Sequence, residues 1–112
     1  MPSRNKALKD FSVVSAGTQD IIESPIIPNN ETWVIRVFGA ADINLGDNKS
    51  SVYVLRFGNS ITRVLSLTGD TKELNLQLEI VGNGVEKLNI IRMNKSGFDK
   101  EMPTWVEAYK RV

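Results

Sequence analysis

The sequence predicts an all-β protein: an antiparallel two-sheet sandwich of about eight strands, jelly-roll-like, with a short flexible N-terminal arm. Three observations lead to this prediction. Apolar and polar residues alternate over short segments, as in LNLQLEI (74–80), where Leu74, Leu76, Leu78 and Ile80 would share one face. Turn-forming residues separate these segments at short intervals. No segment carries the apolar stripe of an amphipathic helix, and many short strands favour a sandwich or barrel.

The N-terminal half begins with the segment 1–8, which is basic and has no periodicity, so we expect a flexible arm before a single sandwich domain over 9–112. Strands follow in KDFSVVSA and QDIIES. Pro25 and Pro28 each lack an N–H and do not suit a central strand. The segment ETWVIRVFGAA is apolar at both odd and even positions, which predicts a central strand covered on both faces.

The C-terminal half repeats the alternation of strands and turns. GNS (58–60) is typical of a tight hairpin between SVYVLRF and ITRVLSL. GNG (82–84) can supply the positive φ angles of another hairpin, between LNLQLEIV and KLNIIRMN. The segment TWVEAYKRV closes the chain. The predicted strands are 9–15, 19–24, 31–41, 51–57, 61–67, 74–81, 86–94 and 103–112.

Composition excludes several classes of function. The 112 residues include neither Cys nor His. Without Cys there are no disulfides, thiolate nucleophiles or Cys-based zinc sites. Without His there is no Ser-His-Asp machinery and no ordinary transition-metal site. We therefore predict a non-enzyme that has no cofactor and no metal. The alternative is a carboxylate-dependent hydrolase that uses a pair among Asp42, Asp47, Asp70 and Glu73.

The charge is small and unevenly distributed. The chain carries a formal charge of +1; residues 1–10 carry three basic residues and one acidic residue, +2, which leaves −1 for the remainder. Three basic residues are too few for a strong nucleic-acid footprint, so Arg4 and Lys6 are expected to contact a neighbouring protein subunit or to remain disordered. No apolar run is long enough to cross a bilayer or to act as a secretory signal. We expect neither nucleic acid nor membrane as a partner.

Two loops invite a ligand assignment. The loop 42–50 contains Asp42, Asn44, Asp47 and Asn48, and oxygen-rich loops bind Ca²⁺. The spacing does not match an EF-hand loop, and a solvated turn is the simpler interpretation. GNG resembles part of a phosphate-binding loop, but the second half of that motif and the receiving helix are absent.

Aromatic and arginine residues are the candidates for an interface. Trp105 and Tyr109 share a face of the last predicted strand with Arg111, and such a strip suits a core, a protein interface or a sugar platform. Arginines also interrupt apolar strands, where they pair with buried carboxylates or lie on an exposed sheet face. A face with several arginines could dock on an acidic partner. These arginines are Arg36, Arg56, Arg63 and Arg92.

One family resemblance is present. IIPNNETWVIRVFGAADI is followed much later by LEIVGNGVEKLNIIRMNKSG. Together they resemble small β-sandwich structural proteins of tailed bacteriophages, of the capsid decoration or staple type, with tail accessory proteins as the near alternative. The likeness covers most of residues 20–112.

The resemblance implies a structural role in which the protein catalyses no reaction. It implies a decoration or cement protein, made in the host cytoplasm and located on the capsid surface of the virion, where it binds the major capsid protein and stabilises contacts between capsid subunits. Exposed strand edges could pair two copies, so a homo-oligomer, with a dimer favoured, is expected. The alternative is a tail accessory protein or a receptor- or carbohydrate-binding module. Arg4, Lys6, Trp105, Tyr109 and Arg111 are the candidate interface residues.

Overall fold

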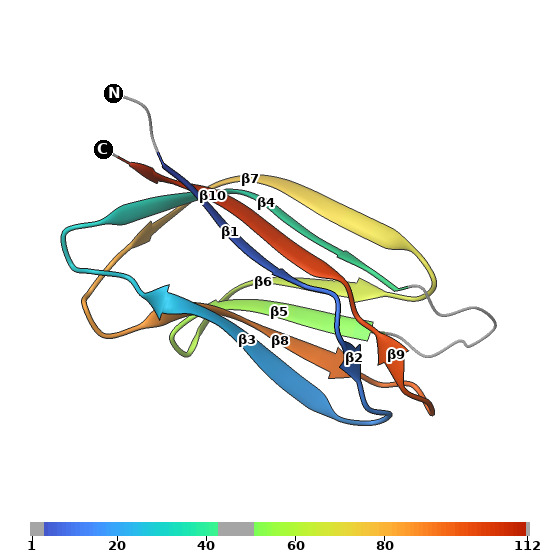
Figure 1. Cartoon of the computed structure of the whole chain (residues 1–112). Helices are drawn as coiled ribbons and strands as arrows, with labels where there is room; N and C mark the ends of the chain where they lie inside the picture. Colours follow the sequence, from blue (N-terminus) through green and yellow to red (C-terminus); the bar gives the residue numbers. More distant parts are fainter. Residues whose placement is uncertain (1–3, 43–50, 112) are drawn as a thin grey trace.

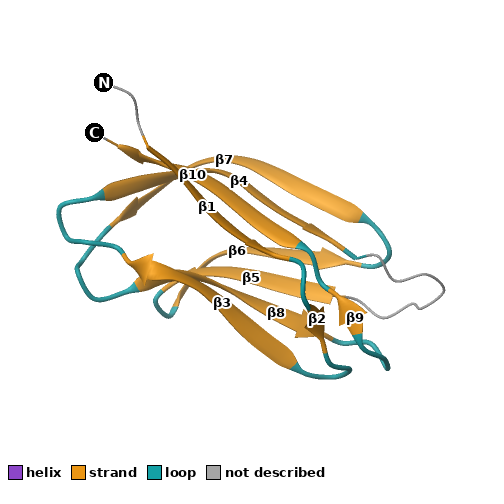
Figure 2. Ribbon diagram, in the orientation of Figure 1, coloured by secondary structure: helices purple, strands orange, loops and turns teal. Residues whose placement is uncertain are grey.

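The chain forms one long antiparallel ribbon that is rolled into two stacked sheets (Figure 1). The computed structural model describes residues 4–42 and 51–111. This described part consists of strands joined by loops (Figure 2), and it holds no helix that could cross a membrane. The strands are β1 (Arg4–Asp10), β2 (Val13–Val14), β3 (Gln19–Ile26), β4 (Thr32–Ala41), β5 (Ser51–Phe57), β6 (Ser60–Leu67), β7 (Thr71–Val81), β8 (Lys87–Asn94), β9 (Lys100–Glu101) and β10 (Thr104–Arg111).

The strand order shows how the ribbon is rolled. One sheet has the order β1-β10-β4-β7, the other has the order β3-β8-β5-β6, and β2 pairs with β9 at one end. The ribbon pairings are nested and antiparallel: β5 with β6, β4 with β7, β3 with β8, β2 with β9 and β1 with β10. This is the arrangement of a jelly roll, in which a folded ribbon makes both sheets. The predicted all-β, two-sheet, jelly-roll-like sandwich is therefore confirmed.

The core lies between the two sheets. The three leucines of LNLQLEI pack against it and Ile80 is buried in it, whereas the polar residues that alternate with them are exposed. Phe38 from β4, Leu55 from β5 and Ile90 from β8 are fully buried in the same cluster. The apolar side of each strand thus covers the inner face of its sheet, as the alternation predicts.

A β-bulge changes the inward-facing positions of β4. Trp33 and Ile35 belong to the core before the bulge, and Phe38 and Ala40 belong to it afterwards. The pairing registers with β10 and β7 both shift here, and Arg36 is exposed. The predicted central position of this strand is confirmed. Its apolar residues at both odd and even positions have two causes. The bulge switches the inward face, and on the outer face Val34 is 0% exposed although it lies outside the core cluster, so the strand is covered there as well.

The beginning of the sandwich differs from the prediction. Residues 4–8, expected in a flexible arm, belong to β1, which pairs with β10; the predicted strand over 9–15 is instead the end of β1 and the two residues of β2. The short strand β9 was not predicted either. In such segments hydrogen bonds to a neighbouring strand set the backbone conformation, so a distinct apolar alternation is not required.

The two glycine-containing turns have different roles. Gly58, with φ of 58°, turns the β5–β6 hairpin as predicted. The predicted hairpin at GNG is wrong, because β7 and β8 belong to different sheets and this segment crosses between them. Gly84 has a φ of 73°, and a Cβ on Gly82 would lie 2.0 Å from the carbonyl oxygen of Pro28. Gly82 and Gly84 therefore allow the chain to pass close to neighbouring backbone where it crosses from one sheet to the other.

Candidate functional site

The outer face of the β1-β10-β4-β7 sheet carries the aromatic strip predicted for the last strand. Trp105, Tyr109 and Arg111 occupy the positions of β10 that alternate with its core residues. The indole of Trp105 lies against Gly39 on β4, and its Nε1 donates a hydrogen bond of 2.9 Å to Oε2 of Glu73 on β7. The ring therefore spans three neighbouring strands and is held in place at its polar edge.

The other predicted interface residues lie on the same two strands. Arg111 forms an ion pair with Glu79 across the sheet. Arg4 and Lys6 lie on β1, which pairs with residues 104–110 of β10. The structure describes the backbone of these two residues but not their side chains. The structure thus places all five predicted residues on two adjacent strands, with Arg4 and Trp105 towards opposite ends of the ladder. The intervening Glu107 is exposed, so this face has both aromatic and charged groups.

The outer face of the β3-β8-β5-β6 sheet has a different character. Ile21, Ile91, Val54 and Val64 are register partners and form a row across all four strands. None of them belongs to the core cluster, whose members are their chain neighbours on the opposite side of the sheet. The two central residues are 8% and 6% exposed, and Ile21 and Val64 at the edges are 48% and 52% exposed. We call these four residues the apolar row.

The two rows that border the apolar row are mixed. In the next register row on one side, Met93 and Val52 extend it between Gln19 and Ser66, and the row on the other side ends in the exposed Ile61. On the other side lie Glu23, Asn89 and Arg56, and Arg56 Nε donates a hydrogen bond of 2.9 Å to Oδ1 of Asn89. This face was not predicted from the sequence. The available signal was the apolar residue in the non-core position of each strand, which becomes a row only when the register is known.

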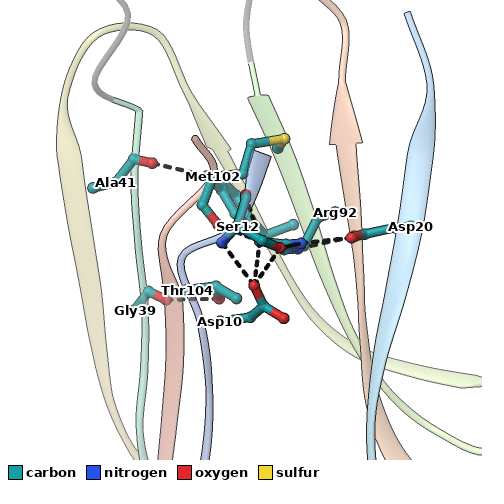
Figure 3. A network of polar contacts seen from close by, with 9 residues as sticks. Asp10, Ser12, Asp20, Gly39, Ala41, Arg92, Met102 and Thr104 are labelled. Atoms are coloured by element: carbon teal, nitrogen blue, oxygen red, sulfur yellow. Dashed lines mark hydrogen bonds and ion pairs between the residues drawn. The ribbon is translucent and has the colours of Figure 1, made fainter. Parts of the chain in front are cut away.

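A buried arginine ties the two sheets together at the end of the sandwich that contains β2 and β9 (Figure 3). The side chain of Arg92 is fully buried and binds both carboxylate oxygens of Asp20, at 2.9 and 2.5 Å. It also donates hydrogen bonds to the carbonyl oxygen of Met102 at 2.7 Å and to Oγ of Ser12 at 2.8 Å, and lies 3.3 Å from Oδ1 of Asp10. These partners come from β1, β3 and the connections beside β2 and β9. We therefore assign Arg92 a structural role.

The four strand arginines do not form one face. Arg36 is exposed on β4, Arg56 lies on the outer face of the other sheet, Arg63 is exposed on the edge strand β6, and Arg92 is buried between the sheets. The hypothesis of one arginine-rich docking face is therefore wrong. The bulge in β4 and the division of these strands between two sheets separate residues that look equivalent in the sequence.

The first residue of the proposed calcium loop is used in a buried ion pair. Oδ1 of Asp42 lies 3.2 Å from Nζ of Lys100, and Oδ2 accepts a hydrogen bond of 3.2 Å from the Gly69 N–H. Both ion-pair side chains are buried. Residues 4–42 and 51–111 contain no group of three or more His, Cys, Asp or Glu residues arranged to hold a metal. The other proposed ligands, Asn44, Asp47 and Asn48, lie outside the described residues.

The carboxylates of the hydrolase alternative have separate partners. Asp42 pairs with Lys100, Asp70 accepts a hydrogen bond from the N–H of Thr68, and Glu73 accepts one from Trp105. Asp47 lies outside the described residues. Each described carboxylate is thus used in a local contact.

The buried phenol of Tyr53 is a further titratable group. Its hydroxyl donates a hydrogen bond of 2.8 Å to the carbonyl oxygen of Ala41 in the opposite sheet. Burial raises the pKa of Tyr53 well above its ordinary value of 10.0, and the Asp42 carboxylate raises that pKa further. The hydroxyl therefore stays protonated at neutral pH and acts as a link between β5 and β4.

A cavity of about 280 Å³ lies between the sheets, beside the edge strands β1 and β3. Leu8, Trp33, Val106 and Ala108 line it from one sheet, and Ile26 and Leu88 line it from the other. The cavity is partly open to solvent, and Ser24, Pro25, Pro28 and Glu31 complete its lining. The sequence could not have shown this cavity, because its six apolar lining residues come from five strands that meet only in the folded chain.

Comparisons with known proteins show similarity of fold only. No family model and no curated protein matches the chain. The solved structure of dimeric latent PorU from Porphyromonas gingivalis is similar with a TM-score of 0.52 and 10% identity over 99% of this chain. The structure of FlhE has a TM-score of 0.43 and 11% identity and covers 96% of both chains. The chain spans 13% of the PorU chain, so the first similarity is to one part of a much longer protein.

Proposed function

We propose that this chain is a non-catalytic virion structural protein that binds the outer surface of an assembled phage capsid and stabilises the contacts between its subunits. The apolar row on the β3-β8-β5-β6 sheet is the observation that supports a binding role most directly. A row of four β-branched residues, with both ends about half exposed, is more than a sheet needs on a face that meets only water.

The surroundings of the apolar row suit a protein partner. Protein interfaces combine an apolar centre with a polar rim, and here Glu23 and Arg56 lie in the bordering row. Burying the exposed parts of Ile21 and Val64 would contribute about 1 kcal/mol each. The contact would therefore be modest for one copy, and the expected dimer would gain avidity by binding two neighbouring sites of a shell.

The resemblance to phage decoration proteins suggests the identity of the partner. A protein that binds the assembled shell but not its separated subunits shifts the equilibrium towards assembly by mass action. This role requires a surface of fixed shape and no reaction. We propose the major capsid protein as the partner and the capsid surface as the location.

Co-sedimentation tests this function. The protein is mixed with expanded shells that lack it, and both sedimentation and shell melting are measured. We expect the wild-type protein to sediment with the shells and to raise their melting temperature. Val64→Lys places a charge on the half-exposed end of the apolar row and should abolish both effects. Val85→Lys is the matched control, because Val85 is 73% exposed in the connection between β7 and β8.

Two outcomes would count against the proposal. A wild-type protein that neither sediments with the shells nor changes their melting excludes capsid decoration. Equal binding by Val64→Lys and the wild type excludes the apolar row as the contact surface. Circular dichroism of both variants confirms that the sandwich is intact.

A carbohydrate-binding module, as on a phage tail, is the second candidate. The specific observation in its favour is the indole of Trp105, which is supported by Gly39 on one side and held by Glu73 at its Nε1. A fixed aromatic ring on a sheet surface is suited to stacking against a sugar ring. A glycan array tests this candidate, with Trp105→Ala as the variant that should lose any signal. Binding that is absent, or that persists in Trp105→Ala, rejects it.

A further inference from the structure

The strand β6 is an open edge of the sandwich that has little protection against pairing with another strand. The edge strands are β1 and β7 in one sheet and β3 and β6 in the other. Proteins commonly protect such edges with charged residues or with proline. β1 carries four charged residues and β7 carries three, and β3 contains Pro25 together with two acidic residues, whereas Arg63 is the single charged residue of β6. β6 is therefore the edge best suited to receive another strand.

The centre of β6 directs its backbone groups to the open side. The carbonyl oxygen of Ser66 accepts a hydrogen bond of 2.9 Å from Lys72 Nζ on β7, so this carbonyl points away from β5. Successive residues of a strand turn their N–H and C=O groups to opposite sides, so Val64 presents its groups to the same open side as Ser66. Towards the other end of the strand, Arg63 Nη1 donates a hydrogen bond of 2.6 Å to the carbonyl oxygen of Thr62. The side chains of Lys72 and Arg63 thus border a stretch around Val64 whose backbone can pair with a strand.

The apolar side chains along this edge are also exposed. Val64, at the end of the apolar row, is 52% exposed, and Ile61 is 65% exposed. Val64 is the register partner of Val54, and Ile61 is that of Arg56, so both lie on the outer face of the sheet. A strand added beside β6 would cover part of both side chains and so contribute apolar burial to the contact.

We propose that β6 pairs antiparallel with β6 of a second copy of this chain, about a two-fold axis that passes beside Val64. In this register Val64 of the two copies are opposite each other, and Thr62 is opposite Ser66. Apolar pairs and Thr–Ser pairs are favourable cross-strand neighbours. Arg63 lies opposite Leu65, so it meets no like charge directly. The apolar rows of the two copies join into one continuous row.

A second copy is the occupant that the sequence of β6 favours. An interface across a two-fold axis contributes the same surface twice, so it must be complementary to itself. The apolar centre of β6 and the position of Arg63 away from the axis meet this condition. The inference goes beyond the proposed binding to a capsid, because it concerns the edge of the sheet and needs no shell.

Sedimentation equilibrium of the wild type and of two variants at Ser66 tests the pairing. We expect a monomer–dimer equilibrium with a Kd of about 10–300 µM, because the pairing is short and resembles a small transient interface. Ser66→Pro removes an N–H that faces the open side and preserves the ladder to β5 and the apolar row, so it should weaken the dimer by about tenfold or more. Ser66→Thr keeps this N–H and should dimerise like the wild type. Circular dichroism checks that both variants fold.

Cross-linking through a single cysteine locates the axis and remains informative if Ser66→Pro does not fold. The chain contains no Cys, so Val64→Cys introduces a unique thiol. In the proposed register the two Cα atoms at position 64 lie about 5.5 Å apart, which a disulfide can bridge. With oxidised glutathione as the oxidant, Val64→Cys should form a covalent dimer. Val85→Cys is the control and should stay monomeric, because Val85 is more exposed, at 73%, but lies outside β6.

Three results would overturn the assignment. The first is a wild-type protein that remains monomeric up to about 1 mM. The second is a folded Ser66→Pro variant that dimerises like the wild type. The third is equal cross-linking of Val64→Cys and Val85→Cys. None of these measurements includes shells, so a failure of capsid binding leaves their outcome unaffected.

Discussion

The indole of Trp105 lies directly on the backbone of Gly39, its register partner across β10 and β4. A Cβ at position 39 would fall 2.3 Å from both Cε2 and Nε1 of the ring. We expect Gly39→Ala to displace the indole, to break its hydrogen bond to Glu73 and to destabilise the fold by about 1–3 kcal/mol.

Tryptophan fluorescence and urea unfolding check this prediction, and Gly97→Ala is the control. A Cβ on Gly97 meets nothing within 4 Å. The emission of Gly39→Ala should shift to the red, whereas that of Gly97→Ala should stay unchanged. Wild-type emission and stability in Gly39→Ala would contradict the contact.

Replacing Arg92 should destabilise the sandwich strongly. Arg92→Met removes the bidentate partner of Asp20, whose side chain is 40% exposed, and leaves the Met102 carbonyl without its donor. Hydrogen bonds to charged groups contribute about 1.5–3 kcal/mol each, so the loss of several of them destabilises the fold. Arg92→Lys should recover little of this loss, because an ammonium group cannot reproduce the planar set of donors. Arg36→Met, at an exposed position, should change the free energy of unfolding by less than about 0.5 kcal/mol. Wild-type stability in Arg92→Lys would refute this account of the network.

The buried ion pair between Lys100 and Asp42 leads to a separate prediction. Lys100→Met leaves the Asp42 carboxylate buried without its ammonium partner and should reduce the free energy of unfolding by about 3–5 kcal/mol. Adding Asp42→Leu removes the buried carboxylate charge and should recover part of the loss. A double-mutant cycle by chemical denaturation measures this coupling, and strictly additive effects would show that the two residues do not interact.

Asp10 should make a pH-dependent contribution to the free energy of unfolding. The hydrogen bond from the Ser12 hydroxyl lowers the pKa of Asp10 from its ordinary value of 3.8, with a smaller contribution from the charge of Arg92. A carboxyl with a lower pKa in the folded state stabilises that state fully above the unfolded pKa, and the stabilisation disappears as the pH falls through the folded pKa.

The measurement is the stability difference between the wild type and Asp10→Asn as a function of pH. This difference should be constant, at about 1 kcal/mol, above about pH 5 and should decrease towards acid from about pH 4. Ser12→Ala should reduce the pH dependence in the same interval. A difference that grows as the pH falls would have the wrong sign.

Much of the fold could be predicted because periodicity is a local property. The alternation in LNLQLEI and the turn at GNS identify β7 and the β5–β6 hairpin without knowledge of the rest of the chain. The bulge at Arg36 could not be predicted in the same way, because it depends on how β4 aligns with β10 and β7. The same limitation produced the false hairpin at GNG, where turn chemistry is visible but the sheets of the flanking strands are not.

The candidate surfaces were predicted less completely. Trp105, Tyr109 and Arg111 could be assigned to one face because they lie on a single strand. The apolar row and the cavity require residues from four and five strands respectively, so both depend on register and topology. Arg92 resembles the exposed Arg36 in the sequence, and its contacts with Asp20, Ser12 and Met102 distinguish it only in the folded chain.

The nested pairing of the ribbon has a kinetic consequence. The β5–β6 hairpin joins residues that are close in the chain, whereas the β1–β10 ladder closes a loop of nearly the whole length. Loop-closure entropy delays such distant contacts, so a topology of this kind has a high contact order and is expected to fold slowly. The central hairpin is the natural nucleus. The outermost ladder should form last and should be the first to exchange its amide protons.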